Sequence, residues 1–379
     1  MLELEWPYRR HCDVYAGAQQ FAQQHDWDCV VDEYAGATLQ QCDRRKPAYD
    51  GVIARATPEL AKQAERCGVP VVNVWFNSPV ASQFPGVYPD GAALGKLAAE
   101  HLLERGFRRF ACLSGQGDRF QRIEIASYHA VLQAAGFSCQ CARAARQFTR
   151  NRATWAGFLS AINKWIASWQ PPLGVYVSFP DVVGRIIAES CRSHGIIVPD
   201  NAALVVSENE PALCLYPSPS LTSVDVSYQQ IGFTAAKLLG QMMEGKKLKA
   251  EENWIAPTGI VARQSTDFFA VDDALVEAGL RFISANVQRP IQVEDVSKGV
   301  FAGRRTLERR FRAVLGRSVA DEIIRLRIER AKRELAGTDG SIKTIAGNTG
   351  FRDAKRMHEV FLREIGVSPT QYRASWRKE

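Results

Sequence analysis

Apolar and polar residues alternate with two different periods along roughly the first 225 residues of the chain. Regular alternation of strands and helices predicts parallel sheets that are covered by helices on both faces. More than 200 residues of this pattern predict two such α/β lobes. Short apolar runs typical of buried strands occur at 2–5, 29–33, 51–54, 71–75, 109–114, 173–178 and 203–207. Segments with the period of amphipathic helices occur at 58–67, 90–105, 122–135, 151–169 and 181–194.

The alternation stops near residues 267–273, and the rest of the chain contains only helical patterns. We therefore expect an effector domain at 1–268, a linker at 269–273 and an all-α domain at 274–379. Ser318 and Ser341 are expected N-caps, and Pro369 suits a first helical position. The helices of this domain are expected at 272–286, 292–299, 304–315, 319–336, after 341, at 352–364 and after 368.

One pattern in the helical region occurs twice, fifty residues apart. Phe301, Leu307, Phe311, Leu315, Gly316 and Ser318 recur as Phe351, Met357, Phe361, Ile365, Gly366 and Ser368. In each copy an i, i+4 apolar pair faces a core, and cationic residues occupy the opposite face. These basic residues are Arg304, Arg305, Arg309 and Arg312 in the first copy and Arg352, Lys355 and Arg356 in the second. A duplicated helical unit of this kind suits two successive DNA grooves.

The charge distribution agrees with a polyanionic partner for that region. Residues 271–379 hold 22 Lys+Arg and 15 Asp+Glu, whereas residues 1–270 hold 26 of each. The whole net charge of +7 therefore lies with the duplicated helices. On charge alone, a solvated basic face remains an equal alternative.

The nine cysteines all lie between Cys12 and Cys214, without Cys-x-x-Cys spacing. We therefore expect reduced thiols and no metal or cofactor, although Cys139 and Cys141 would share one face of a strand. The N-terminus has no apolar secretion segment, and no apolar run is long enough to cross a membrane. A cytoplasmic, nucleoid-associated location is expected.

The first region carries a family resemblance. Asp90-Gly91 leads into Ala98-Ala99-Glu100-His101-Leu102-Leu103, and Val198-Pro199-Asp200 precedes 203–209. Pro219-Ser220-Leu221-Thr222-Ser223-Val224 and the helical stretch 231–239 follow. Together these stretches resemble the LacI/GalR-type effector domains. The resemblance covers roughly 1–268 without that family's N-terminal headpiece, and it implies a two-lobed periplasmic-binding-protein-like clamshell that closes on a sugar.

Residues that follow the predicted strands are the candidates to line such a site, because ligands bind at the carboxyl ends of parallel strands. Aromatic rings stack on sugar faces, and carboxylates and amides hydrogen-bond to sugar hydroxyls. Core packing is an almost equal alternative for Trp75, whereas Trp155, Trp165 and Trp169 fit helix packing better. The candidates for stacking are Trp6, Trp75, Phe120 and Phe179, and those for hydrogen bonding are Glu5, Asn77, Arg122, Glu208 and Asn209.

Two departures from the family pattern affect this site. Glu124 stands where the family often has an arginine, and Glu208-Asn209 replaces the family's Asp-Asn or Asp-Asp pair. The pocket is therefore either reshaped for another sugar or weakened.

The C-terminal region is similar to the AraC/XylS DNA-binding domain. The resemblance rests on 304–311, on the turn around Gly350-Phe351 and on Phe361-x-x-x-x-Gly366-Val367-Ser368-Pro369-x-x-Tyr372-Arg373. An effector domain of the first type placed ahead of this domain resembles the xylose operon regulators. The expected fold is therefore multidomain, an α/β clamshell followed by an all-α domain with two helix-turn-helix motifs.

The resemblance implies base-reading positions at Arg305, Glu308 and Arg309, and at Ala354, Lys355 and Glu359. Arginine suits guanine and glutamate suits cytosine, whereas Ala354 offers only an apolar contact. We therefore expect the first copy to dominate specificity. Phosphate contacts are expected from Arg304, Arg312, Arg352, Arg356, Arg363 and Arg373.

The sequence thus predicts a sugar-responsive transcription regulator of a pentose operon, not an enzyme. The expected partners are double-stranded operator DNA, a sugar effector such as D-xylose, a second copy in a homodimer, and RNA polymerase. A regulator of another carbohydrate or small molecule is the alternative. A more distant one is an alkyl-accepting repair protein, which the cysteine spacing disfavours.

Overall fold

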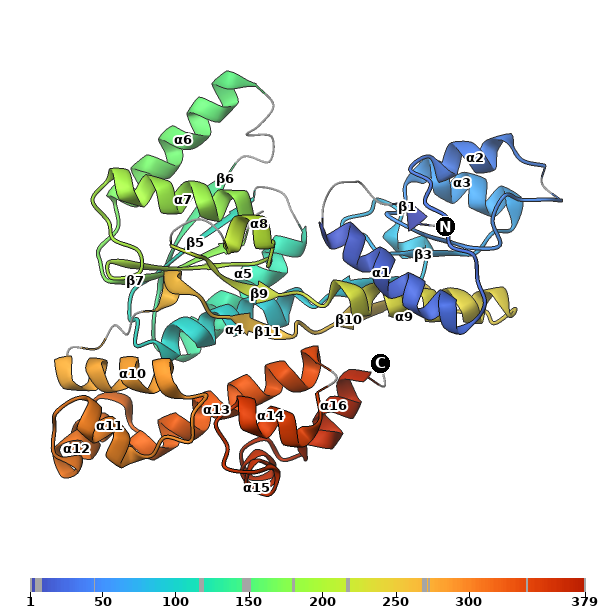
Figure 1. Cartoon of the computed structure of the whole chain (residues 1–379). Coiled ribbons are helices and arrows are strands. Elements are labelled where there is room, and N and C mark those ends of the chain that lie inside the picture. The colour runs from blue at the N-terminus through green and yellow to red at the C-terminus, as the bar shows by residue number, and fades with distance from the viewer. Residues whose placement is uncertain are drawn as a thin grey trace. The chain divides into compact units, whose positions relative to one another are not determined.

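The computed structural model of the 379-residue chain divides into two compact units (Figure 1). The first contains residues 1–96, 115–128 and 225–257, and the second contains 97–114, 129–224 and 258–379. The residues that the structure describes are 2–3, 9–43, 45–115, 119–144, 151–178, 181–215, 219–267, 271, 273–338 and 340–377.

The first unit is built on a five-stranded sheet of order β1-β2-β3-β4-β10, in which the recorded strand pairs are parallel. Its core joins the sheet residues Ile53, Val72 and Val87 to α1 and α9. The strands are β1 (Leu2–Glu3), β2 (Val52–Ala54), β3 (Val71–Asn73), β4 (Gly86–Pro89) and β10 (Glu252–Ile255). The helices are α1 (Arg9–Gln24), α2 (Ala35–Gln41), α3 (Pro58–Cys67) and α9 (Tyr228–Met243), with a 3-10 turn at Ala81–Gln83.

Glycines let α1 and α9 touch backbone to backbone. A Cβ at Gly17 would lie 1.8 Å from the Gln229 carbonyl oxygen, and one at Gly232 would lie 1.8 Å from that of Val14. Real Cβ atoms do not approach backbone oxygens so closely, so no larger residue fits either position without separating the two helices.

The second unit contains a six-stranded sheet of order β11-β9-β8-β7-β5-β6. Its core includes Trp165 and Trp169, whose rings meet edge to face at 4.9 Å, and Trp155 packs against that core. The packing role expected for these tryptophans is confirmed. The strands are β5 (Phe110–Gly115), β6 (Cys139–Ala144), β7 (Leu173–Ser178), β8 (Ala202–Val206), β9 (Thr222–Asp225) and β11 (Gly259–Val261). The helices are α6 (Arg152–Ala167), α7 (Asp181–Ser193) and α8 (Pro211–Cys214), with a 3-10 turn at Gln264–Thr266.

Two further helices, α4 (Gly91–Glu104) and α5 (Arg119–Ala134), begin in the first unit and end in the second. The remainder of the second unit is helical, and its helices form two small cores. The helices are α10 (Ala274–Asn286), α11 (Val293–Gly299), α12 (Arg304–Leu315), α13 (Val319–Gly337), α14 (Ile342–Asn348), α15 (Ala354–Ile365) and α16 (Pro369–Arg377).

Helix α13 belongs to both cores. Val319 and Ile323 near its start join the core of α10, α11 and α12, whereas Ile328, Ala331 and Leu335 join that of α14, α15 and α16. Its 19 residues span about 28 Å at the usual helical rise. The expected rigid spacer between the two copies is therefore present as a continuous helix.

The expected capping residues are confirmed at several helix starts. Ser318 accepts from the backbone N–H of Asp321, and the Asp321 carboxylate accepts in return from the backbone N–H of Ser318. Ser341 and Asp353 cap α14 and α15 by accepting from the backbone N–H groups of Thr344 and Arg356. These bonds pair backbone donors that a helix start otherwise leaves unsatisfied.

Most predicted strands are confirmed within two residues of their ends, but the strand expected at 29–33 is wrong. Only Val31 makes an isolated bridge there, and Val30 and Val31 are both exposed, so this apolar pair has no sheet to enter. The pattern also missed α1, α2, α8, β4, β9, β10 and β11, and it gave β6 no bounds although Cys139 and Cys141 were expected on a strand. The polar residues Glu252 and Asn253 in β10 and the short length of β11 hide these strands from a search for apolar runs.

Candidate functional site

The helical part of the chain contains two helix-turn-helix units with matching turns. In the first, the Ala302 N–H donates to the Ser297 carbonyl oxygen at 3.1 Å. In the second, the Phe351 N–H donates to the Ala346 carbonyl oxygen at 3.0 Å. Phe351 is therefore the counterpart of Ala302, and the counterpart of Phe301 is Gly350.

This register corrects the repeat read from the sequence, in which Phe301 was paired with Phe351. Phe351 is buried in the second core, whereas Phe301 is 98% exposed. Phe301 has a φ of 53°, in the left-handed region where Gly350 has a φ of 78°. The segment between α11 and α12 is one residue shorter than the segment between α14 and α15. The offset between the two copies is therefore 49 residues at the turn and 50 residues in the following helix, which aligns Phe301 with Gly350.

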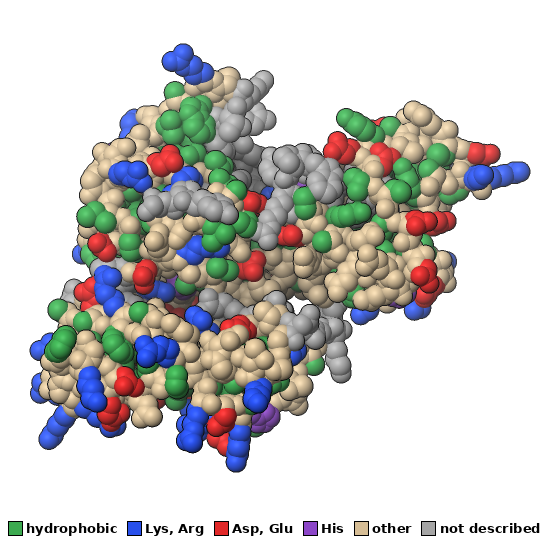
Figure 2. All heavy atoms as spheres, in the orientation of Figure 1, with side chains coloured by type: hydrophobic (Ala, Val, Ile, Leu, Met, Phe, Trp, Pro, Cys, Tyr) green, Lys and Arg blue, Asp and Glu red, His purple; other side chains and the backbone are tan. Residues whose placement is uncertain are grey.

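The two second helices, α12 and α15, each divide into a buried and a cationic face. Leu307 and Phe311 of α12 are fully buried, as are Met357 and Phe361 of α15. Figure 2 shows Lys and Arg side chains gathered along the lower edge of the molecule, where these two helices lie. The exposed basic residues include the predicted Arg304, Arg305, Arg309 and Arg312 on α12 and Arg352, Lys355 and Arg356 on or beside α15, together with Arg310 and Arg363.

The predicted base-reading residues of the first helix are not equally available. Arg305 and Arg309 are exposed, and neither makes an ion pair or side-chain hydrogen bond with any residue that the structure describes. Glu308 is partly buried, and its carboxylate lies 3.8 Å from Arg312. On α12, the guanidinium groups of Arg305 and Arg309 therefore have no partner among the described residues. The carboxylate of Glu308 must break its ion pair with Arg312 before it accepts a hydrogen bond from a base.

The second helix presents less to a base. Ala354 at its first position is partly buried, and the Glu359 carboxylate accepts from Arg356 at 3.4 Å. Lys355 is exposed. These positions agree with the weaker reading role expected for this copy, which nonetheless remains a prediction.

The two helix starts also differ in their charge. The N-cap of α12 is Gly303, which has no side chain, and Arg304 and Arg305 follow it. The N-cap of α15 is Asp353, whose carboxylate accepts from the Arg356 N–H at 2.7 Å. A helix start with open N–H groups and cations attracts phosphate, whereas a start capped by a carboxylate repels it. The start of α12 is therefore the better anion site of the two.

Several of the expected phosphate contacts already have partners. Arg304 pairs with Glu294, and Arg363 pairs with Glu364 at 2.7 Å. Both pairs are exposed, so exchange for a phosphate costs little. Arg373 differs, because it is partly buried and donates to the Gly340 carbonyl oxygen at 2.6 Å. We conclude that Arg373 holds α16 to the loop before α14 rather than facing solvent.

A buried carboxylate of α13 binds the turn between α12 and α13. Glu322 is fully buried and accepts from Arg317 at 2.6 Å and from Arg325 at 2.8 Å. Burial raises the pKa of Glu322, but the hydrogen bonds and charges of Arg325 and Arg317 outweigh it, so the net pKa lies below the ordinary value. Arg325 also donates to Glu104 of α4 at 2.5 Å, within the second unit.

Four predicted effector contacts lie in the first unit. Trp75 is partly buried, and the Arg55 guanidinium lies 4.7 Å from its ring centroid. Phe120 packs edge to face on Phe76 at 6.1 Å. Asn77 is partly buried and Arg122 is exposed. Trp75 and Phe120 thus retain partial exposure, which stacking on a sugar requires.

Two predicted contacts lie in the second unit, just after β8. The Asn209 amide oxygen accepts from Ser223 at 3.0 Å and from Arg263 at 2.5 Å. Arg263 also donates to the Leu221 carbonyl oxygen at 2.6 Å. The sequence did not point to Arg263, because it lies 54 residues from Asn209 and in no strand. Glu208 is partly buried.

The remaining predicted effector contacts, Glu5, Trp6 and Phe179, lie outside the described residues. Glu124, noted as a departure from the family pattern, is buried on α5. A Cβ at Gly95 of α4 would lie 1.9 Å from the Glu124 carbonyl oxygen, so α4 and α5 cross closely at this point.

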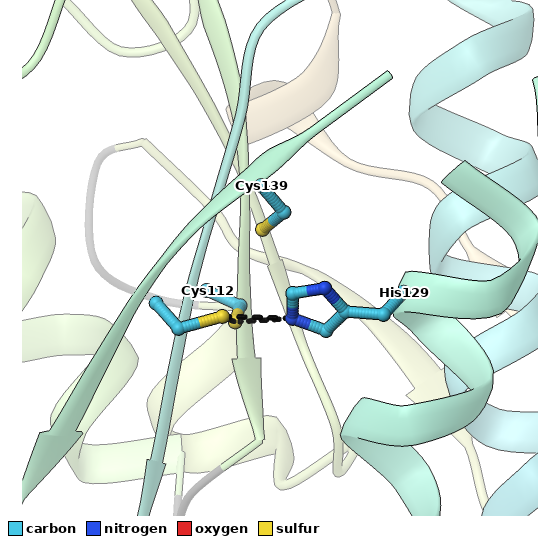
Figure 3. Close-up of side chains that lie close together, drawn as sticks. Cys112, His129 and Cys139 are labelled. Atoms are coloured by element: carbon cyan, nitrogen blue, oxygen red, sulfur yellow. Dashed lines mark hydrogen bonds between the residues drawn. The ribbon is translucent and has the colours of Figure 1, made fainter. Parts of the chain in front are cut away.

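A separate group of side chains has the chemistry of metal ligands. Cys112 of β5, His129 of α5, and Cys139 and Cys141 of β6 place four ligand atoms within 4.8 Å of one another. The Cys141 Sγ lies 2.8 Å from that of Cys112 and 2.7 Å from the His129 Nε2. Figure 3 shows the His129 ring extending from its helix toward the sulfur of Cys112, with Cys139 above it. The shared face expected for Cys139 and Cys141 is confirmed.

Two family models match this chain. Residues 99–266 match the periplasmic binding protein-like domain, and residues 296–375 match a helix-turn-helix domain. Together with the fold, they confirm the predicted class of an α/β domain followed by a helical domain. Among the helices that the structure describes, none is long and apolar enough to span a membrane.

Relatives match over nearly the whole chain. The chain is 26% identical to the xylose operon regulatory protein of Haemophilus influenzae over 372 residues, which cover 95% of this chain and 94% of the relative. It is 25% identical to that of Escherichia coli K12 over 373 residues, with coverages of 97% and 94%. A solved xylose-binding transcription activator, xylR, has a TM-score of 0.59 at 22% identity and covers 99% of this chain and 97% of its own.

Proposed function

We infer that this chain, a homologue of the xylose operon regulators over nearly its full length, is a sugar-responsive DNA-binding transcription regulator. The observation that carries this inference is the pair of helix-turn-helix units with outward-facing cations, joined to a periplasmic-binding-protein-like domain. A protein with this role acts on chromosomal DNA, so we propose a cytoplasmic location. The relatives are regulators, which supports a protein without enzymatic activity.

We propose that α12 reads bases and that α15 mainly holds the DNA backbone. Arg305 and Arg309 have guanidinium groups without a partner among the described residues, and such groups suit the two acceptors of guanine in the major groove. Arg352 and Arg356 are exposed and suit phosphate oxygens, which position a protein without specifying sequence. The two helices, joined by α13, would occupy successive grooves about 34 Å apart.

Competitive binding measurements test this assignment. DNA from upstream of the neighbouring genes is compared with random DNA of equal length, at one stated salt concentration. Arg305→Ala and Arg309→Ala are expected to lose roughly 1–3 kcal/mol of discrimination between the two DNAs. Arg352→Ala is the matched control, because loss of a phosphate contact weakens binding to both DNAs equally. Equal weakening on both DNAs by the α12 variants would contradict base reading.

We further propose that the effector is D-xylose or a closely similar pentose. The support is that the relatives are xylose operon regulatory proteins, together with partly buried polar candidates in each unit, among them Asn77 and Glu208. Binding of the sugar would change how a homodimer presents its two DNA-binding regions to repeated half-sites and to RNA polymerase. The sugar shifts this equilibrium only by its difference in affinity for the two states.

A thermal-shift screen of pentoses and hexoses on the full chain tests the effector. A sugar at about 100 times its Kd should stabilise the domain that binds it by about 2.7 kcal/mol. We expect xylose to raise the melting temperature of wild type and to raise it less in Glu208→Gln. Asp200→Asn, on the loop before β8, is the matched control. A shift with a hexose instead of xylose would exclude the pentose but not the regulator.

A further inference from the structure

The group formed by Cys112, His129, Cys139 and Cys141 has no place in the DNA-reading or sugar-binding roles. Its residues come from two strands and one helix, and their side chains converge on one point instead of packing separately. The other cysteines that the structure describes, such as Cys29 and Cys191, have no such neighbours. Convergence of four donor atoms therefore distinguishes this site from the ordinary buried thiols of the chain.

Three sulfurs and one imidazole nitrogen form the donor set of a structural zinc site. Zinc is bound tetrahedrally by such sets, with Zn–S bonds of about 2.3 Å and Zn–N bonds of about 2.0 Å, so the donor atoms around it lie about 3.5–3.8 Å apart. The four atoms here lie within 4.8 Å of one another, and Cys112 Sγ lies 3.6 Å from His129 Nε2. The sulfur of Cys141 must withdraw by about 1 Å to admit the ion.

The positions of the four residues fit the entry and retention of an ion. Cys112 is buried on β5, whereas Cys141 is exposed on β6. The Cys112 sulfur shields one side of the ion from solvent. The Cys141 sulfur lies at the surface, where an ion can enter. His129 reaches the same point from α5 and supplies the fourth position.

The site explains how the sheet of the second unit ends. Strand β6 is the last strand in the order β11-β9-β8-β7-β5-β6, and residues such as Gln140 and Arg143 in it are exposed. An edge strand with few buried residues gains little from apolar packing. A metal bound by β5, β6 and α5 would fix this edge at three points.

We propose that Cys112, His129, Cys139 and Cys141 bind one Zn²⁺ ion that fastens the edge strand β6 and helix α5 to β5. A closed four-ligand site of this kind contributes folding free energy and leaves no position for a substrate. Absence of Cys-x-x-Cys spacing disfavours only zinc sites whose ligands lie close together along the chain. These ligands are spread over 29 residues from Cys112 to Cys141, so that spacing rule does not apply to them.

Metal analysis of the full chain tests the proposal. The protein is expressed with zinc in the medium and purified under reducing conditions without a chelator, and its zinc content is measured by mass spectrometry. We expect about one zinc per chain in wild type and in Cys29→Ser, the matched control with a cysteine outside the cluster. Cys141→Ser and His129→Asn should retain less than about a tenth of that zinc, since each removes one of four ligands.

A second measurement keeps the test independent of variant folding. Wild type is stripped of metal with a chelator and titrated with Co²⁺, whose thiolate charge-transfer and tetrahedral d–d bands report three sulfur ligands directly. Those bands, and a lower melting temperature of the stripped protein that zinc restores, would support the site. Zinc far below one per chain together with absent cobalt bands would overturn it.

Discussion

Phe301 and Gly350 occupy the same position in the two turns and have opposite environments. Phe301 is almost fully exposed and gains no burial in exchange for its left-handed backbone. A Cβ at Gly350 would lie 2.0 Å from the Val287 carbonyl oxygen. The same backbone conformation therefore tolerates a side chain in the first turn but not in the second.

This contrast predicts very unequal effects of two substitutions on the free energy of unfolding. Phe301→Gly relieves left-handed strain of about 1–2 kcal/mol but adds freedom to the unfolded chain, so it should change the free energy of unfolding by less than about 1 kcal/mol. Gly350→Ala should lower that free energy by roughly 3 kcal/mol or more, because strain and a backbone clash add. Urea unfolding of the full chain measures both. A stable Gly350→Ala would contradict the assigned turn.

At the scale of single elements, α13 is the helix on which both DNA-binding units depend. Its first turn is capped by Ser318 and anchored by Glu322, and its second half fills the other core. Glu322 is fully buried between two partly exposed arginines, so removal of its charge takes from Arg317 and Arg325 the carboxylate that they share.

Glu322 therefore predicts a pH-dependent contribution to stability. Because the folded pKa of this carboxyl is lowered, its contribution is present above the unfolded pKa and is lost as the pH falls through the folded value. Glu322→Ala should lower the free energy of unfolding by roughly 3–5 kcal/mol near pH 7. The difference from wild type should shrink below about pH 4.

Urea unfolding at neutral and acidic pH checks this prediction. Glu364→Gln is the control, because Glu364 pairs with Arg363 at the surface and its loss should change the free energy of unfolding by less than about 1 kcal/mol. A difference between wild type and Glu322→Ala that stays constant down to acid pH would show that the glutamate acts through packing and not through its charge.

At the scale of the whole molecule, charge is divided between the two functions. Residues 1–270 are neutral overall, and residues 271–379 hold the net charge of +7. DNA binding should therefore weaken steeply with salt through the helical region alone, because each neutralised phosphate releases counterions.

The salt dependence distinguishes surface arginines from structural ones. Each phosphate contact contributes about −0.9 to the slope of log K against log salt concentration. Arg352→Ala should reduce the magnitude of this slope by about 1. Arg373→Ala should leave the slope unchanged, because this side chain is committed to Gly340. Binding to random DNA between low and physiological salt measures both slopes. A reduced slope for Arg373→Ala would show that Arg373 does contact a phosphate.

Local pattern was sufficient for much of the fold and for part of the site. Period and capping placed α12 at its observed ends and identified Ser318, Ser341 and Pro369 at helix starts, because these signals depend on residues within one or two turns. The division of α12 and α15 into apolar and cationic faces was also readable, since a helix fixes which residues share a face.

Distant pairings were decided only by the tertiary structure. The sequence could not show that Arg373 turns to Gly340 or that Phe301 stands where the second turn has Gly350. The first pairing depends on which of several nearby groups a side chain contacts in the folded protein. The second depends on a difference of one residue in turn length. The strand expected at 29–33 was wrong for the same reason, because a β-branched run becomes a strand only where a sheet edge accepts it.

By itself, then, the sequence determined an α/β effector region, a duplicated basic helical region and the charge that separates them. Those features follow from short-range periodicity and composition. The tertiary structure alone decided which cations remain free to meet DNA and which four donors, from β5, α5 and β6, meet at one point. Residues far apart in the chain are brought together by the parallel order of strands and the crossing of helices, which no local pattern specifies.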